Sequence, residues 1–290
     1  MGMRIRTNVS SLVSQRHAER NNEAMSKSLE RLSSGSRINR SADDAAGLAI
    51  SENIEGKTRG LSQAKRNAND AVSMVQIAEG GMNEMSNILI RMRELTVQAA
   101  SDTIGDSERG FLNREYTQLV DEIDRIAKTA EFNGLKFFDT EKTEFVIQVG
   151  TNNSAPEDNI DTLTIDLSGI QFNSEQLGLG KENEIGPVSE DGDAPTRAEI
   201  GEKLSTIDTA LKRVASERAT LGAVQNRLGS TISNIGVSIE NMSTAKSRIA
   251  DVDYASETAE MTKSRILTQA STSVLSQANT SQDMVLQLLR

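Results

Sequence analysis

The sequence predicts a mainly α-helical protein, built as a long helical bundle with coiled-coil hairpins, a small β-hairpin region and paired N- and C-terminal arms. Three observations support this prediction. Apolar residues recur at three- and four-residue spacing through both outer parts of the 290-residue chain. All three prolines, Pro156, Pro187 and Pro195, lie in the middle. Seven of the eight aromatic residues fall between Phe111 and Phe172. The outer parts can therefore form long helices that no proline interrupts.

Apolar stripes mark the individual helices. Leu221, Leu228 and Ile235 follow a seven-residue repeat that Met242 continues, and this repeat predicts a coiled-coil seam. Further positions at helical spacing are Ile232 and Ile239 beside that repeat; Met85, Ile88, Met92, Leu95 and Ala99; Leu112, Tyr116, Leu119, Ile123 and Ile126; Ala18, Met25, Leu29 and Leu32; and Val252, Ala255, Ala259, Ile266, Ala270, Val274 and Ala278.

Local signals place the other elements. In SADDAAGLAI (41–50), Ser41 can cap a helix and Asp44 completes a pair similar to a capping box. TEFVIQVG (143–150) and DTLTIDLSGI (161–170) are β-branched runs around a turn-rich stretch, which predicts a hairpin. EIGPVSEDGDAP (184–195) has loop composition.

These signals divide the chain into three expected regions. Residues 1–44 and 251–290 should form paired terminal helices. Residues 45–138 and 196–250 should form a helical rod domain. Residues 139–195 should form a β-hairpin and an acidic outer loop, because residues 139–193 hold thirteen Asp and Glu against two Lys.

Composition argues against several classes of function. The net charge of −10 disfavours nucleic-acid binding, which needs Lys and Arg to neutralise phosphates. There is no cysteine, and His17 is the only histidine, so we expect no metal site, no cofactor and no catalytic residue. Carboxylates such as Asp43, Asp44, Asp251 and Asp253 are read as capping or solvated groups. No apolar run approaches the ~18 residues of a membrane span, and the start lacks the apolar core of a secretory signal.

The C-terminal stretch DMVLQLLR (283–290) is unusually apolar for a chain end. Chain ends fray unless something holds them, and single helices in water are marginally stable. Pairing of the two arms leaves much of each helix uncovered. We therefore expect the arms to be disordered in the monomer and to fold on association with further copies of the chain.

Long segments closely resemble the two ends of bacterial flagellin. They are LSSGSRINRSADDAAGLAISENI (32–54) and the whole stretch from AVQNRLG (223–229) to LQLLR (286–290). RMRELTVQAASDT (91–103), EIDRIAKTAEFNG (122–134) and IQVGTNN (147–153) resemble the parts between them. The likeness extends over nearly the whole chain, and the short middle resembles a core-only form without added outer domains.

The resemblance implies a structural subunit, not an enzyme, that polymerises into the flagellar filament for swimming motility. It implies an extracellular location reached through the flagellar export apparatus with a chaperone and without a cleaved signal peptide, contacts with hook-junction and cap proteins, and no membrane insertion. The terminal arms would lie in the inner tube of the filament. The expected assembly residues are Ile5, Val9, Leu12, Leu29, Leu32, Leu228, Ile235, Val274, Leu275, Val285, Leu286, Leu288 and Leu289.

The resemblance also places Arg91, Leu95 and Glu115 at the patch that the flagellin-sensing Toll-like receptor of animal hosts reads. Leu95 belongs to a core-like stripe as well, so packing is the alternative role of this region.

Two other readings remain at this level. A hook–filament junction protein shares similar helical ends but differs more in the central matches. A signalling hairpin similar to the cytoplasmic part of a chemoreceptor shares the heptads, but has no place for the β-hairpin insert.

Overall fold

The computed structural model describes residues 7–138, 144–152, 159–180, 185–186 and 196–288. Within these residues the chain forms long α-helices and two small antiparallel hairpins, which confirms the predicted mainly helical fold. The helices are α1 (Val9–Ser34), α2 (Ala45–Ala99), α3 (Asp106–Thr129), α4 (Arg197–Ala250) and α5 (Tyr254–Leu288). The strands are β1 (Glu131–Phe132), β2 (Leu135–Lys136), β3 (Glu144–Gln148) and β4 (Thr162–Asp166), with short 3₁₀ turns at Asn159–Asp161 and Ser168–Ile170.

The chain divides into two compact units. Unit 1 contains Met1–Thr58 and Glu240–Arg290, and unit 2 contains Arg59–Ile239. Both boundaries fall inside long helices, α2 and α4, and not at the helix ends near residues 44 and 251. The three-region division of the sequence analysis remains a prediction.

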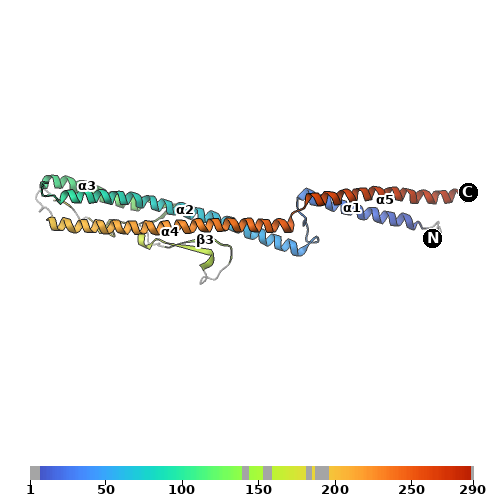
Figure 1. Ribbon diagram of the computed structural model, residues 1–290, viewed down its shortest axis with the longest axis horizontal. Helices are drawn as coiled ribbons and strands as arrows, with labels where there is room; N and C mark the ends of the chain where they lie inside the picture. The colour runs from blue at the N-terminus through green and yellow to red at the C-terminus, as the bar shows by residue number, and fades with distance from the viewer. Residues whose placement is uncertain (1–6, 139–143, 153–158, 181–184, 187–195, 289–290) are drawn as a thin grey trace. The chain divides into compact units, whose positions relative to one another are not determined.

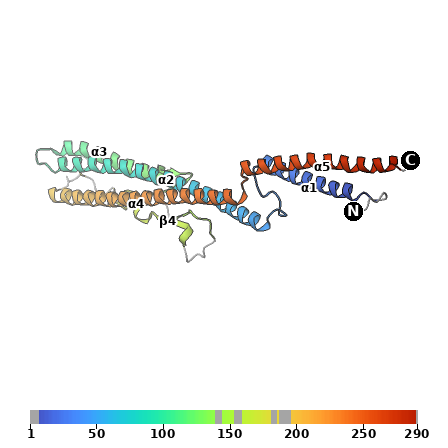
Figure 2. The same cartoon turned by 45° about the vertical axis from the view of Figure 1, so that its right-hand side comes forward.

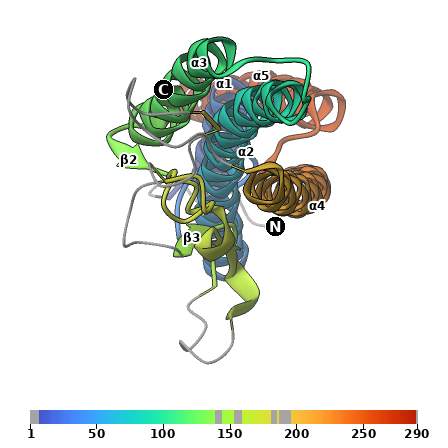
Figure 3. The ribbon, with the colours of Figure 1, turned by 90° about the vertical axis from the view of Figure 1, so that its left-hand side faces the viewer.

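Unit 2 is built around one apolar core shared by α2, α3, α4 and the hairpins. Figures 1 and 3 show α2 running beside both α3 and α4. The predicted stripes supply the core. Met85, Met92 and Leu95 of α2 are fully buried, as are Ile123 of α3 and Leu228 of α4. The 3.6-residue period of the apolar positions therefore selected the correct faces of these three helices.

Polar contacts along the flanks hold the three helices of unit 2 in register. Arg93 of α2 lies 2.7 Å from the carboxylate of Asp208 of α4. Gln225 of α4 donates a 2.7 Å hydrogen bond to Glu79 of α2. These contacts join residues of α2 and α4 that are far apart in sequence. They add directional contacts to an apolar core, in which different packings of similar volume are tolerated.

The predicted hairpin is confirmed. β3 pairs antiparallel with β4, with Glu144 opposite Asp166 and Gln148 opposite Thr162. Phe145, Leu163 and Ile165 point into the core of unit 2, while the alternate residues are exposed. The period of two thus gives this small sheet one buried face.

A second hairpin, β1–β2, was not predicted. Its two-residue turn is Asn133–Gly134, and both residues have positive φ angles, of 52° and 79°. Asn-Gly is the preferred pair for such a turn, since both residues tolerate the left-handed conformation. The dipeptide was therefore a usable signal in the sequence.

Unit 1 is an antiparallel pair of α1 and α5, which lie side by side in Figures 1 and 2. Asn8 caps the start of α1 by accepting a hydrogen bond from the backbone of Ser11, and also donates to the carbonyl of Ala278. At the other end, Gly35 closes α1 with a φ angle of 70°, a conformation that favours glycine. The predicted pairing of the two arms is present in the structure.

The predicted cap at Ser41 is wrong. Residues 41–43 form a turn, and α2 begins at Ala45. The N-cap is Asp44, whose carboxylate accepts a 2.8 Å hydrogen bond from the backbone of Gly47. Asp253 performs the same role for α5, accepting from the backbones of Ala255 and Ser256. Asp44 and Asp253 are thus capping groups and Asp251 is exposed, as expected, whereas Asp43 is neither a cap nor a solvated group, because it pairs with Lys27 and its side chain is 14% exposed.

Candidate functional site

The contact between α1 and α5 is lined largely by small and polar side chains. At its closest positions the buried residues are serines: Ser14, Ser28 and Ser264 are 8%, 3% and 3% exposed. The remaining heptad-spaced positions are partly buried. They are Ser11, Ala18, Asn21, Met25 and Leu32 of α1, and Glu257, Met261, Thr268, Ser271, Leu275 and Ala278 of α5. We call these fourteen positions the α1–α5 seam.

Several large apolar side chains of unit 1 lie outside this seam, although Met25, Leu32, Met261 and Leu275 belong to it. On α1, Val9 and Leu12 are 59% and 52% exposed, and Val13 is exposed as well. On α5, Ile266 and Val274 are 62% and 57% exposed, beside the exposed Leu267. Burial of each such residue is worth roughly 1.5–3 kcal/mol, so an uncovered row of them favours association.

The exposed apolar residues of α5 form one continuous stripe. Ala255, Ala259, Ile266, Ala270 and Val274 recur at the spacing of a single helix face, and all are exposed. The stripe that the sequence predicts for α5 also contains Val252 and Ala278, which are partly buried, and Ala278 belongs to the seam with α1. The five exposed residues lie outside that seam. We call them, together with Leu267, the outer stripe of α5. Within the described residues of unit 1, no side chain covers it.

The predicted assembly residues occupy three kinds of environment. Val9, Leu12, Leu29 and Val274 are exposed, whereas Leu32 and Leu275 are partly buried in the seam. Leu228 and Ile235 are buried within unit 2. The last group lies outside the described residues or has side chains outside them: Ile5, Val285, Leu286, Leu288 and Leu289. Sequence reasoning missed Val13 and Leu267, although each is one helical turn from, or adjacent to, a predicted residue.

The three residues assigned to receptor recognition are close together but differ in access. Arg91 of α2 forms ion pairs of 2.8 Å with Glu115 of α3 and 3.0 Å with Glu94. The hydrogen bonds that the Arg91 guanidinium donates to Glu94 and Glu115 raise its pKa above the ordinary value. Leu95, one turn away, is 0% exposed. A partner that contacts the folded chain here can touch Arg91 and Glu115, while Leu95 supports them from beneath.

The described residues lack the arrangement that a metal site requires. Among the described residues, no three His, Cys, Asp or Glu side chains are placed to hold one metal ion. His17 is exposed on α1, as expected. None of the described helices combines the length and apolar character required to cross a membrane. What the described surface offers is apolar contact area, chiefly the outer stripe of α5.

A helical bundle whose two terminal helices pair and leave apolar residues exposed has an architecture suited to contacts with other chains. The chain belongs to the bacterial flagellin family. The model of the bacterial flagellin N-terminal helical region matches residues 5–143, and that of the C-terminal helical region matches residues 204–289.

Individual relatives agree with this assignment. The chain is 42% identical to a flagellin of Bacillus subtilis (strain 168) over 304 residues, which covers 99% of this chain and 100% of the relative. It is 39% identical to flagellin FlaB2 of Treponema pallidum (strain Nichols) over 299 residues, with 99% and 100% coverage.

Among solved structures, a putative flagellar hook-associated protein from Vibrio parahaemolyticus shares the fold, with a TM-score of 0.57. It covers 72% of this chain and 100% of that protein at 15% sequence identity. At this identity the likeness concerns the fold alone. Because the flagellin models and the nearly full-length flagellin relatives match the sequence itself, a hook–filament junction protein is not favoured.

Proposed function

We infer that this chain is a structural subunit that polymerises into the bacterial flagellar filament and so serves swimming motility. The observation that supports this most directly is the outer stripe of α5, which faces away from α1. A helix that presents large apolar residues such as Ile266 and Val274 outward, in addition to those it packs in its intramolecular seam, is suited to a contact with other copies.

The geometry of the polymer follows from the type of contact. The outer stripe of α5 and the exposed first turn of α1 are different surfaces of one chain. If unlike surfaces meet, the contact is heterologous, and a heterologous contact whose rotation does not close into a ring produces a helical filament. The extracellular location of such a filament agrees with the flagellin relatives.

The inference is tested by seeded polymerisation of the purified chain. Short filament fragments added to monomer should elongate into long filaments under electron microscopy. A matched variant, Ile266→Asp with Val274→Asp, should not elongate, because charged groups then occupy the stripe. Elongation of this variant at the wild-type rate would contradict the role of the stripe, and a wild-type chain that never elongates would contradict the function.

Finer features of the function are also proposed. The terminal helices lie in the interior of the filament and gain their order on association, since a seam of serines stabilises an isolated pair weakly. The chain leaves the cell through the flagellar export apparatus with a chaperone and without a cleaved signal peptide. Hook-junction and cap proteins meet the ends of the filament. The proposal that the terminal helices gain their order on association is tested by hydrogen exchange of monomer and filament. Strong protection of α1 and α5 is expected in the filament alone.

A second role is recognition by a flagellin-sensing Toll-like receptor where a host is present. The support for it is the exposed Arg91–Glu115 pair between α2 and α3. The test is a receptor-driven reporter response to the monomer and to an Arg91→Ala variant.

A further inference from the structure

An apolar groove lies in unit 2 between α2, the β1–β2 hairpin and β3. Its volume is about 450 Å³. Met74 and Phe145 are buried at its floor, whereas Leu135 and Val146 are exposed at its edge. Asp70 of α2 also lines the groove, and it has no ion-pair partner among the described residues. The groove therefore suits an apolar side chain accompanied by a cation.

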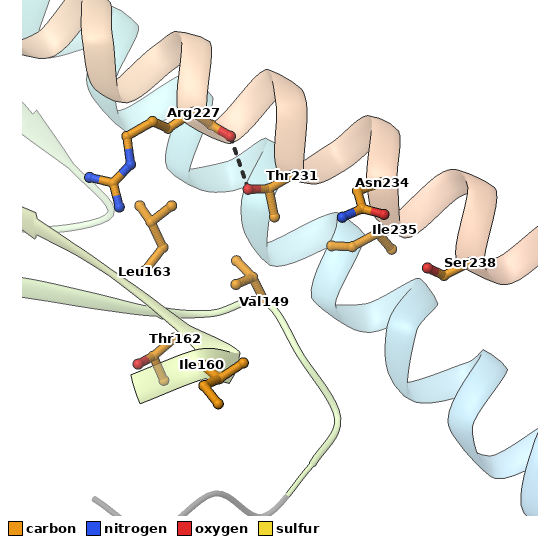
Figure 4. A pocket seen from close by; sticks show the side chains of 9 residues that line it. All are labelled: Val149, Ile160, Thr162, Leu163, Arg227, Thr231, Asn234, Ile235 and Ser238. Atoms are coloured by element: carbon orange, nitrogen blue, oxygen red, sulfur yellow. Dashed lines mark hydrogen bonds between the residues drawn. The ribbon is translucent and has the colours of Figure 1, made fainter. Parts of the chain in front are cut away.

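A second hollow, of about 430 Å³, lies between the β3–β4 hairpin and α4. Figure 4 shows Arg227 extending from α4 toward Leu163, with Ile160 at the end of the hairpin. Ile160 is 79% exposed, the largest value among the exposed large apolar residues that the structure describes. Within the described part of the chain, Arg227 has no ion-pair partner either. This surface offers an apolar side chain accompanied by a cation.

The two surfaces are complementary in apolar shape and in charge. One provides an apolar groove and a free carboxylate, and the other an exposed isoleucine and a free guanidinium. They share no lining residue and lie along different helices, α2 and α4. In its own chain Ile160 lies at the end of the hairpin, near Val149 (Figure 4), and does not line the groove of the same molecule.

We propose that Ile160 of one chain enters the α2-side groove of a second copy, where Arg227 of the first chain pairs with Asp70 of the second. The proposal rests on the inferred function and adds a lateral or axial contact made by unit 2. Because the joined surfaces differ, the contact is heterologous and can repeat from copy to copy along a filament. It places the exposed isoleucine and the guanidinium that line one hollow opposite an apolar groove that carries a carboxylate, so both the apolar and the charged groups meet a complementary partner.

The absence of cysteine from the chain permits a direct test by cross-linking. Ile160→Cys chains and Leu135→Cys chains are polymerised as an equal mixture and then oxidised. A disulfide-linked dimer should form in filaments of the mixture, at a yield well above that of either variant alone. Ile90→Cys replaces Leu135→Cys as the control, since Ile90 is a comparably exposed residue of α2 that does not line the groove.

Charge exchange tests the ion pair separately. Arg227→Asp and Asp70→Arg should each raise the critical concentration for elongation by about tenfold, as expected for a desolvated contact. The chain carrying both changes should return close to the wild-type value, whereas Lys212→Asp on an exposed position of α4 should change it little. Circular dichroism confirms that each variant is folded.

Two results would overturn this contact: filaments of the cysteine mixture without dimers above the single-variant level, or a double charge variant whose loss equals the sum of the single losses. In both cases the wild-type chain still forms filaments. Failure of the wild-type chain to elongate at all would instead count against the inferred function itself.

Discussion

The guanidinium Nη1 of Arg31 lies 3.5 Å from the carboxylate Oε2 of Glu257, and this ion pair joins α1 to α5 inside a seam of small polar residues. The two side chains are only 25% and 13% exposed. A seam of serines, threonines and small apolar residues distinguishes poorly between its own register and one shifted by a heptad. A charge pair at one position does distinguish them, since a shift would leave both charges without a partner.

The Arg31–Glu257 pair should therefore control the pairing of the terminal helices. Glu257→Gln should lower the free energy of unfolding of the paired arms in filaments by about 1 kcal/mol, because a partly exposed pair is lost. The measurement is hydrogen exchange along α1 and α5. Arg31→Glu combined with Glu257→Arg should restore protection. Equal protection in the wild type and the single variant would show that the pair has no role in register.

Charges on the exposed first turn of α1 should block assembly as effectively as charges on α5. Leu12→Asp with Val13→Asp adds two charges to a surface that the fold leaves uncovered, so the monomer should keep its thermal stability within about 0.5 kcal/mol. Sedimentation after seeding measures the loss of polymer. The matched control is Ser276→Asp, an exposed position of α5 away from both the seam and the outer stripe. Loss of assembly in that control would indicate a general charge effect.

Removal of residues 251–290 should separate folding from polymerisation. Unit 2 has its own core, so the shortened chain should still unfold cooperatively and keep the far-ultraviolet signal of α2, α3 and α4. Without α5 the outer stripe and the seam are both absent, and elongation should stop. Filaments of the truncated chain in electron micrographs would contradict this expectation.

Acid should weaken the segment between α1 and α2 through Asp43. The Lys27 ammonium lies 2.6 Å from the Asp43 carboxylate, and the backbones of Asn39 and Arg40 donate to the same carboxylate. These bonds, the one from Lys27 first, hold the pKa of Asp43 below its ordinary value. Since the folded pKa is depressed, the stabilisation is complete above about pH 5 and is lost as pH falls below about 4.

The pH prediction is measured by comparing unfolding of wild type and Asp43→Asn between about pH 3 and pH 7. The variant should be less stable near neutral pH and should converge with the wild type in acid. Parallel curves over the whole range would assign the acid sensitivity to other carboxylates.

Leu95 and Arg91 should behave differently in receptor assays. Leu95→Ala empties a fully buried position and should destabilise the fold by about 2–5 kcal/mol. Arg91→Ala removes exposed ion pairs and should leave stability nearly unchanged while it lowers the reporter response. Melting temperature and reporter activity are measured on the same samples. A reporter response to Arg91→Ala equal to that of wild type would remove this pair from the recognition surface.

The sequence by itself determined the helices, their core faces in unit 2, the β3–β4 hairpin and the flagellin resemblance. These features follow from local periodicity: apolar residues every three to four positions for α2, α3 and α4, and every two for β3 and β4. The Asn133–Gly134 turn was equally readable. The N-cap of α2 could not be identified from the sequence. Ser41 and Asp44 are both good capping residues, and only the path of the chain before Ala45 decides between them.

The tertiary structure alone decided which face of α5 meets α1. The strongest apolar pattern of α5 contains Ile266 and Val274, and a rule that buries apolar residues would place it in the seam. In the structure the seam instead uses Ser264, Thr268 and Ser271, whose small side chains let two helices approach closely, together with Met261 and Leu275. The apolar pattern of α5 does not indicate whether its apolar face is covered by α1 of the same chain or by another copy of the chain. That depends on which surfaces remain after the two arms have paired.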